Sequence, residues 1–465
     1  MKRLNIVLLL SFVIVFAQAE ISLPKFFASD MVLQQQTTVK IWGKAEPNKR
    51  VKVFTSWNLK RYKTTADNNG DWSIAFNTGK AGGPYFITIS DGKLLKLNNI
   101  LLGEVWLCSG QSNMEMPMKG FMGQPIEGGN TAIMQSENNQ LRLFRVGRKA
   151  DLEVQTDVVG RWEEALPISV MDFSATAYYF GRMLQETLNV PVGLISSSWG
   201  GSIIEAWMDE DMLKAFPNAI IPTQSDAIKH PHKTPTMLYK GMLKPLAGIA
   251  VKGVIWYQGE SNKDNYDEYP ELFRTMTDGW RKAWGQKEMP FYFCQIAPYK
   301  YVGGKNSAFI REAQAKTAKQ PQTAMAVLMD TGEELCIHPA KKREAGERLA
   351  YLALQKSYNY QGIVAESPEY KTFEIKDNKV TILFDKAPMG IYAKGRRSQQ
   401  FQIAGADKVF YPAEAVVQNN KVVVSSEQVP HPVAVRYAFD DFVVGDLFGM
   451  GDLPVSSFRT DDWDE

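Results

Sequence analysis

A serine and a histidine in two separate polar loops are the residues of this sequence best suited to acyl-transfer chemistry. Ser112 lies in the segment CSGQSNM (108–114), directly after an apolar run. The glycine and small residues predict a tight turn from a strand into a helix, which exposes a serine hydroxyl and places its backbone N–H at a helix N-terminus. The alternatives are an ordinary N-cap serine at this position, or Ser109, nearer the strand, as the nucleophile.

Histidine is scarce enough to make the base identifiable. The sequence has four histidines: His230, His232, His338 and His431. A serine nucleophile needs a base that is neutral near pH 7, and imidazole is the usual one. Only His338 follows a predicted central strand (324–329) and has carboxylates beside it. We therefore predict Ser112 as nucleophile and His338 as base, the alternative being a structural histidine.

Two further loops carry groups that suit a developing negative charge. The segment SWGGS (198–202) contains Gly200-Gly201, which lets a backbone N–H approach a ligand closely, although an ordinary turn has the same composition. In QGESN (258–262), Gln258 could donate an amide N–H to an oxyanion, and Glu260 could be the acid partner of the histidine or hold the loop. Ligands of open α/β sheets bind beyond the carboxyl ends of the strands, so these loops should meet.

The elements that must position these loops follow from the apolar pattern. Between about 99 and 358, short apolar runs alternate with helix-like stretches, which is typical of a parallel sheet with helices on both faces. Central strands are predicted at 100–107, 190–197, 253–257, 291–296 and 324–329, and helices at 176–188 and 341–356. The flanking regions, 20–98 and 359–465, carry only strand and turn signals and indicate β domains.

The first nineteen residues read as an export signal. Lys2 and Arg3 precede the apolar run 6–16, and the small-x-small pattern Ala17-Gln18-Ala19 follows. The apolar run is too short to span a membrane, and no other stretch is long and apolar enough. The sequence predicts a cleaved signal peptide (1–19) and an exported, periplasmic or extracellular protein without a membrane span; an uncleaved anchor is the alternative.

Charge and cysteine usage exclude several other classes. Without Lys2 and Arg3 the 53 Lys and Arg fall to 51, equal to the 51 Asp and Glu, and a neutral chain argues against a nucleic-acid partner. Three cysteines, each inside an apolar run, are predicted as buried thiols rather than a disulfide framework: Cys108, Cys294 and Cys336. The one close pair of histidines has no further Cys or His cluster, so neither a metal site nor an organic cofactor is predicted.

Taken in order, four segments resemble the blocks of SGNH/GDSL-type hydrolases: GQSNM (110–114), SWGG (198–201), WYQGESN (256–262) and IHP (337–339). The chain outside them resembles the sialate O-acetylesterase family at SDMVLQ (29–34), FYPA (410–413) and SFRTD (457–461). The resemblance covers nearly all of the mature chain. It implies a three-layer α/β/α SGNH-hydrolase-like core with a parallel sheet (99–358), flanked by N-terminal (20–98) and C-terminal (359–465) β-sandwich domains.

The resemblance also implies the reaction, which is removal of acetyl groups from a sugar through a serine acetyl-enzyme. Ser112 would be nucleophile and His338 its base, and the oxyanion donors would be the N–H groups of Ser112 and Gly201 and the side chain of Gln258. The expected partner is an O-acetylated carbohydrate. Alternatives are acetylated xylan or another plant polysaccharide as substrate, or a non-catalytic carbohydrate-binding protein.

One departure from the pattern concerns the triad acid. Related hydrolases commonly carry an aspartate three residues before the histidine, and Leu335 occupies that position here. Glu334 and Glu260 are then equally expected as the acid, with Asp330 next. A Ser–His dyad assisted by a backbone carbonyl is a further alternative, since some acceptor must fix the imidazole tautomer.

Overall fold

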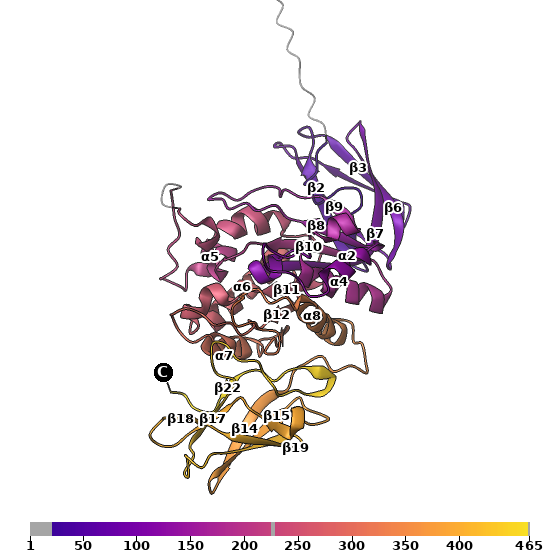
Figure 1. Cartoon of the computed structure of the whole chain (residues 1–465). Coiled ribbons are helices and arrows are strands. Elements are labelled where there is room, and N and C mark those ends of the chain that lie inside the picture. The colour runs from indigo at the N-terminus through magenta and orange to yellow at the C-terminus, as the bar shows by residue number, and fades with distance from the viewer. Residues whose placement is uncertain (1–20, 225–227, 464–465) are drawn as a thin grey trace, which may run out of the picture.

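The computed structural model describes residues 21–224 and 228–463. The predicted export signal (1–19) lies outside the described residues. Figure 1 shows strands of the N-terminal region at one end, strands of the C-terminal region at the other, and a helix-rich part between them. The chain is thus a mixed α/β protein with β structure at both ends, as the sequence predicts.

A parallel sheet forms the middle of the molecule. Its strand order is β13-β12-β11-β7-β10-β8-β9, and only the edge strand β9 is antiparallel to its neighbour. The strands are β7 (Leu94–Gly110), β8 (Asn138–Arg145), β9 (Trp162–Ala165), β10 (Val192–Ser198), β11 (Gly253–Tyr257), β12 (Phe291–Cys294) and β13 (Thr323–Ala326). All five predicted central strands are present, whereas β8 and β9 were not predicted.

Both faces of this sheet are covered, because alternate residues of each central strand belong to different apolar clusters. Trp106 and Cys108 of β7 pack in one cluster with residues of α4 and α8, while Val105 and Leu107 pack in the other with residues of α6 and α7. The helices are α1 (Ser112–Glu115), α2 (Gly129–Met134), α3 (Pro167–Val170), α4 (Ala175–Leu188), α5 (Glu210–Leu213), α6 (Tyr269–Trp284), α7 (Ala308–Thr317) and α8 (Lys342–Ser357). The helices predicted at 176–188 and 341–356 are α4 and α8.

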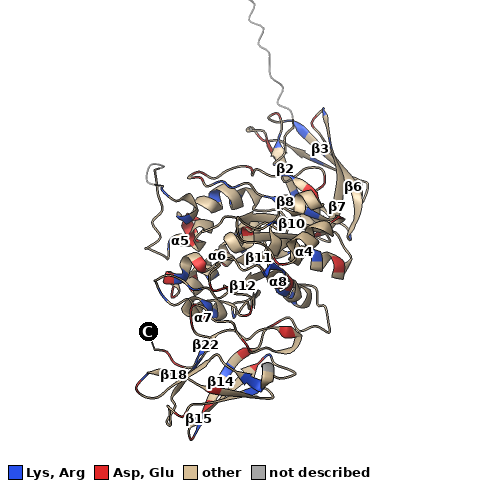
Figure 2. Ribbon diagram, in the orientation of Figure 1, with Lys and Arg blue, Asp and Glu red and all other residues tan. Residues whose placement is uncertain are grey.

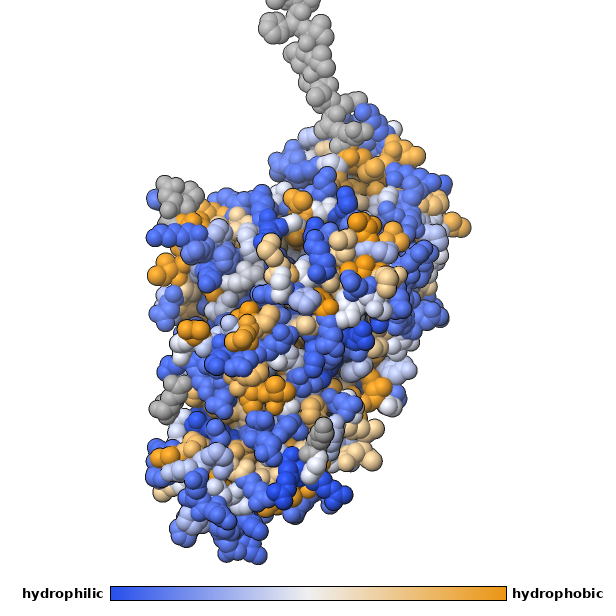
Figure 3. All heavy atoms as spheres, in the orientation of Figure 1, coloured by the Kyte–Doolittle hydropathy of each residue, from blue (hydrophilic) through white to orange (hydrophobic). Residues whose placement is uncertain are grey.

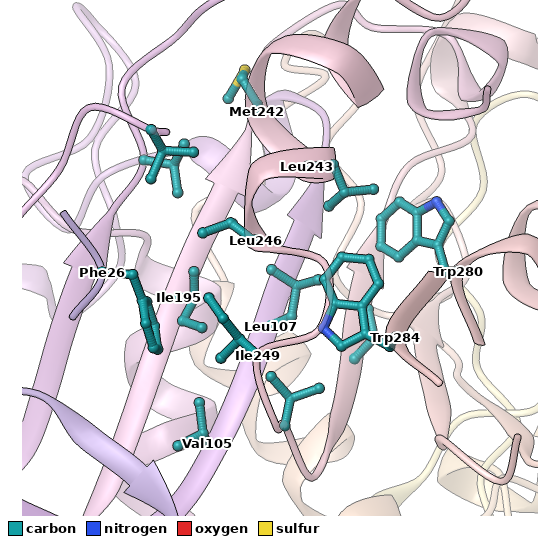
Figure 4. Packing of buried hydrophobic residues seen from close by; sticks show 14 of the residues in the cluster. Phe26, Val105, Leu107, Ile195, Met242, Leu243, Leu246, Ile249, Trp280 and Trp284 are labelled. Carbon is teal, nitrogen blue, oxygen red and sulfur yellow. The ribbon is translucent and has the colours of Figure 1, made fainter. Parts of the chain in front are cut away.

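A loop segment completes the second of these clusters. Figure 4 shows Leu246 and Ile249 lying over Val105 and Leu107 of β7 and Ile195 of β10. All five side chains are no more than 4% exposed. This loop segment therefore covers part of that face of the sheet, next to β7 and β10.

The N-terminal strands join the central sheet through one continuous strand. β7 pairs with β6 as far as Leu102 and with β10 from Glu104 onward. The predicted domain boundary at 98/99 therefore lies inside β7. The remaining strands are β1 (Val32–Gln34), β2 (Thr38–Lys44), β3 (Arg50–Thr55), β4 (Lys60–Thr65), β5 (Asp71–Asn77) and β6 (Gly82–Ser90).

The C-terminal region adds two antiparallel sheets, ordered β14-β15-β20-β19-β16 and β18-β17-β21-β22. Val380 and Val422 of the first sheet share an apolar cluster with Ile403 and Val435 of the second. The strands are β14 (Glu369–Lys376), β15 (Lys379–Asp385), β16 (Arg397–Ser398), β17 (Phe401–Ala404), β18 (Phe410–Pro412), β19 (Glu414–Gln418), β20 (Lys421–Ser425), β21 (Ala434–Tyr437) and β22 (Phe458–Arg459).

Charges are mixed over the molecule. Figure 2 shows Lys and Arg interspersed with Asp and Glu along the chain, and Figure 3 shows a polar face broken by small apolar areas. In the described ranges, no helix has the length and apolar character needed to cross a membrane. The three cysteines are free thiols; Cys108 and Cys294 are buried as predicted, and Cys336 is half-buried.

Candidate active site

Ser112 stands at a turn that only glycine can make. Gly110 ends β7 with φ +138°, and a Cβ there would lie 2.2 Å from the carbonyl oxygen of Tyr257 on β11. Gln111 then donates its N–H to the same oxygen at 2.9 Å, and α1 begins at Ser112. Neither the hydroxyl nor the backbone N–H of Ser112 bonds to any residue that the structure describes. Both groups are therefore available to a substrate.

The Gly200-Gly201 loop packs directly against this serine. A Cβ on Gly200 would lie 3.3 Å from Cβ of Ser112, and the Gly200 N–H donates to Oε2 of Glu115 at 2.7 Å. Gly201 has φ +72°, and its N–H has no partner within the described part of the chain. The predicted oxyanion donors Ser112 and Gly201 thus provide two free backbone N–H groups on adjoining loops.

Asn113 fastens three loops together beneath the serine. Its amide nitrogen donates to Oε1 of Glu260 at 2.5 Å and to the carbonyl oxygen of Ile337 at 3.1 Å. Its amide oxygen accepts from Nζ of Lys342 at 2.6 Å, and the same ammonium donates to the carbonyl of Pro339 at 2.9 Å. The residue after the predicted nucleophile is therefore bonded directly to Ile337, which precedes the predicted base, and is linked through Lys342 to Pro339, which follows it.

His338 is half-buried, and its ring is held on two sides. Nδ1 lies 2.8 Å from Oε1 of Gln124, and the ring of Phe121 packs edge-on with 5.2 Å between centroids. Burial and the charge of Lys342 lower the pKa of His338 to about 4. The imidazole is therefore neutral near pH 7, the form that can accept a proton.

No carboxylate within the described residues contacts this imidazole. Glu334 is 48% exposed and pairs with Lys300 at 2.8 Å, while Asp330 makes two 2.6 Å bonds to Arg348. Glu260 is buried against Asn113, as described above, and burial raises its pKa. The structure therefore does not bring Glu334 or Glu260 onto the histidine.

Gln258 is also placed differently from the expectation. It is fully buried, and its amide nitrogen donates to the carbonyl oxygen of Ser202 at 3.2 Å and to Oδ1 of Asn262 at 2.6 Å. Its amide oxygen accepts from the hydroxyl of Tyr269 at 3.0 Å. With both amide hydrogens used inside the protein, Gln258 supports the loop beneath the site rather than facing a substrate oxygen.

Polar and aromatic side chains lie around the Gly200-Gly201 loop and Glu115 of α1. His232 stacks on Trp199 at an interplanar angle of 17°, and its ring lies 3.3 Å from where a Cβ of Gly201 would stand. Arg148 lies over the Trp199 ring, 5.4 Å from its centroid, and makes two 2.6 Å bonds to Glu115. A cavity of about 400 Å³ beside α1 is lined by Glu115, Pro117, Phe121, Arg145, Val146, Gly147, Arg148, Asp172, Ser174, Ser196 and Ser198. Hydroxyl, guanidinium and carboxylate groups of this kind suit the hydroxyls of a sugar.

Gln124 and Lys342 are site residues that sequence reasoning missed. Gln124 is 214 positions from the histidine it contacts, and nothing in its own segment marks it except glycines at 120 and 123. Lys342 lies four residues after His338 at the start of a predicted helix, where a lysine is normally exposed. Across the described ranges, no group of three or more His, Cys, Asp or Glu is arranged to hold a metal ion.

Comparisons with known proteins show which family the chain resembles. A family model described as carbohydrate esterase, sialic acid-specific acetylesterase, matches residues 102–355. Human sialate O-acetylesterase is 31% identical over 397 residues, which cover 76% of this chain and 74% of the human protein. The rat sialate O-acetylesterase is 28% identical over 449 residues, 80% of each chain. The crystal structure of a carbohydrate acetylesterase from Xanthomonas citri is 36% identical, with a TM-score of 0.87, and covers 96% of this chain and 100% of that one.

Proposed function

Because the chain belongs to the sialic acid-specific acetylesterase family of carbohydrate esterases, as its sequence resemblance predicts, we propose that it removes O-acetyl groups from sugars through a serine acetyl-enzyme. It is a hydrolase of carboxylic esters. The observation that supports this mechanism is the contact between loops: Gly200, the neighbour of Gly201, lies against Ser112, and within the described residues neither the Ser112 hydroxyl nor the Gly201 N–H has a hydrogen-bond partner. Acyl transfer needs that combination of nucleophile and oxyanion donors.

In the proposed reaction, Ser112 Oγ attacks the acetyl carbonyl carbon while Nε2 of His338 takes the hydroxyl proton. The negative charge that develops on the carbonyl oxygen is stabilised by the N–H groups of Ser112 and Gly201. The C–O bond to the sugar then breaks, and the sugar oxygen leaves with the proton from the imidazole. Water then attacks the acetyl-serine as the same imidazole takes its proton. The serine oxygen leaves with that proton from the imidazole, and acetic acid is released and ionises to acetate in solution.

We infer three further properties. The helices on both faces of the central sheet support a three-layer α/β/α core, and the cluster shared by the two C-terminal sheets supports a β-sandwich there. The N-terminal pattern at 1–19 supports export, to the periplasm or the outside of the cell. The substrate proposed is an O-acetylated sugar, with acetylated sialic acid ahead of acetylated xylan because of the family.

Labelling with a fluorophosphonate tests the nucleophile directly. The wild type should be labelled, Ser112→Ala should not, and Ser109→Ala serves as the matched control because that serine is buried in β7. Hydrolysis of p-nitrophenyl acetate should fall at least about 10³-fold in Ser112→Ala and in His338→Ala. Full activity in either variant would refute the assignment.

Acetate release from O-acetylated sialic acid and from acetylated xylan tests the substrate. Faster release from the sialic acid is expected. Faster release from xylan would keep the mechanism and change the sugar. An unlabelled protein that binds either sugar without releasing acetate would instead be a carbohydrate-binding protein.

A further inference from the structure

We propose that Gln124, rather than a carboxylate, is the positioning residue that orients the base: its amide oxygen holds His338 in the tautomer that can accept a proton from Ser112. This inference rests on the proposed function for the role of the base. The contact itself is the 2.8 Å separation between Gln124 Oε1 and His338 Nδ1.

The chain holds Gln124 in place through a closed turn. Phe121 and Gln124 exchange backbone hydrogen bonds of 2.9 and 3.0 Å. Gly120 has φ +81°, and a Cβ there would lie 2.3 Å from the carbonyl oxygen of Gln124, so a side chain at 120 would force the turn open. Two residues of one turn, Phe121 and Gln124, therefore reach the imidazole together.

The same segment is tied to the loop that carries the base. Glu127 donates its N–H to the carbonyl oxygen of Ala340 at 3.0 Å, two residues beyond His338. On the other side, Met118 donates to the carbonyl of Phe173 at 2.9 Å. The first bond ties the Gln124 turn to the histidine loop, and the second ties the other end of the segment to the residues just before α4.

An amide oxygen only accepts hydrogen bonds, and this fixes the tautomer. A proton on Nδ1 donates to Gln124, which leaves a lone pair on Nε2 for the proton of the serine hydroxyl. An amide turned the other way would donate to Nδ1 and leave the proton on Nε2, a tautomer that cannot act as base. The amide oxygen of Gln124, a neutral acceptor, thus takes the role that a triad aspartate usually has.

The charged groups around the imidazole support a neutral ring. Lys342 of α8 is buried on one side, and its charge disfavours the imidazolium. The buried carboxyl of Glu260 is bonded to Asn113, and Glu333 accepts the N–H of Ala340 at 2.7 Å. With no carboxylate on Nδ1, the imidazole stays unprotonated in mildly acidic solution.

Histidine NMR measures both the tautomer and the titration without relying on activity. The protein has only four histidines, so ring ¹⁵N labelling gives few signals, and His338→Gln assigns the relevant one. In the wild type we expect the tautomer protonated on Nδ1. In Gln124→Glu a carboxylate faces the ring, and the pKa of His338 should rise by at least about one unit. The control is Gln135→Glu, which makes the same change at an exposed glutamine later in the chain. It should leave the titration of His338 unchanged.

Kinetics extend the test to the reaction. Gln124→Ala should lower kcat about tenfold or more, with KM changed less than about threefold. Gln124→Glu should keep kcat near the wild-type value at pH 8. Its kcat/KM should begin to fall at a higher pH than in the wild type, because the pKa of His338 is raised. A ring protonated on Nε2 in the wild type, or a titration unmoved in Gln124→Glu, would overturn the proposal. An inactive wild type with the expected NMR result would instead refute the proposed function alone.

Discussion

Replacing Asn113 by alanine should remove the hydrogen bonds that hold the loops of the site together. The side chain donates to Glu260 and to Ile337, and it accepts from Lys342. Both Glu260 and Lys342 are almost fully buried, and Oε2 of Glu260 already lacks a partner among the described residues. Removing the amide therefore leaves two buried ionisable groups with fewer hydrogen bonds than before.

The magnitude follows from these bonds. Hydrogen bonds to charged groups contribute about 1.5–3 kcal/mol each and the neutral one about 1, so the free energy of unfolding should fall by about 4 kcal/mol once water partly replaces the amide. For a domain of this size each kcal/mol changes Tm by roughly 2–4 °C, which gives a decrease of about 10 °C. Differential scanning calorimetry should detect this in the transition of the central region.

The control for this variant is Asn69→Ala, an exposed asparagine of the N-terminal strands. Its Tm should stay within about 2 °C of the wild type. If Asn113→Ala melts as high as that control, the network does not hold the loops together, and the reasoning from buried hydrogen bonds fails.

Three other outcomes are expected. Gly110→Ala should give little folded protein in a solubility assay, because its Cβ would overlap a carbonyl oxygen of the next strand. Asp330→Asn, which breaks the partly buried pair with Arg348, should cost about 2 kcal/mol in denaturant unfolding, whereas Glu334→Gln at an exposed ion pair should cost less than about 1 kcal/mol. The pKa of His338 is lowered, so its neutral form persists on acidification, and kcat/KM should hold between pH 7 and 5.5 and fall only as pH approaches about 4; a fall centred near pH 6.5 would contradict this.

Strands buried on both faces were predictable because their composition is local. Gly253–Tyr257 is an unbroken apolar run between polar residues, and β11 has those bounds. β8 was not predicted because Arg142 interrupts its apolar pattern. That arginine is only 2% exposed and pairs with Glu164 at 3.0 Å, a partner that the local sequence does not reveal.

The site residues divide in the same way, into those that the local sequence reveals and those that depend on distant parts of the chain. Ser112, Gly201 and His338 could be selected because each follows a central strand, and parallel strands bring their carboxyl ends to one edge. The direction of a side chain could not be predicted in this way. Gln258 follows a strand too, yet its amide is used inside the protein, and Gln124 reaches the histidine from a turn that follows no central strand.

β7 belongs both to the N-terminal strands and to the central sheet, so no linker separates them. The same strand continues to Gly110, the residue that makes the turn before the serine. Cutting the chain at the predicted boundary would also divide this strand and strip β6 from its edge. A shortened protein that starts near residue 99 would therefore lose the strands that pair with the first half of β7, the strand that leads to the catalytic turn. The N-terminal strands are thus better regarded as part of the structure that supports the site than as a separable domain.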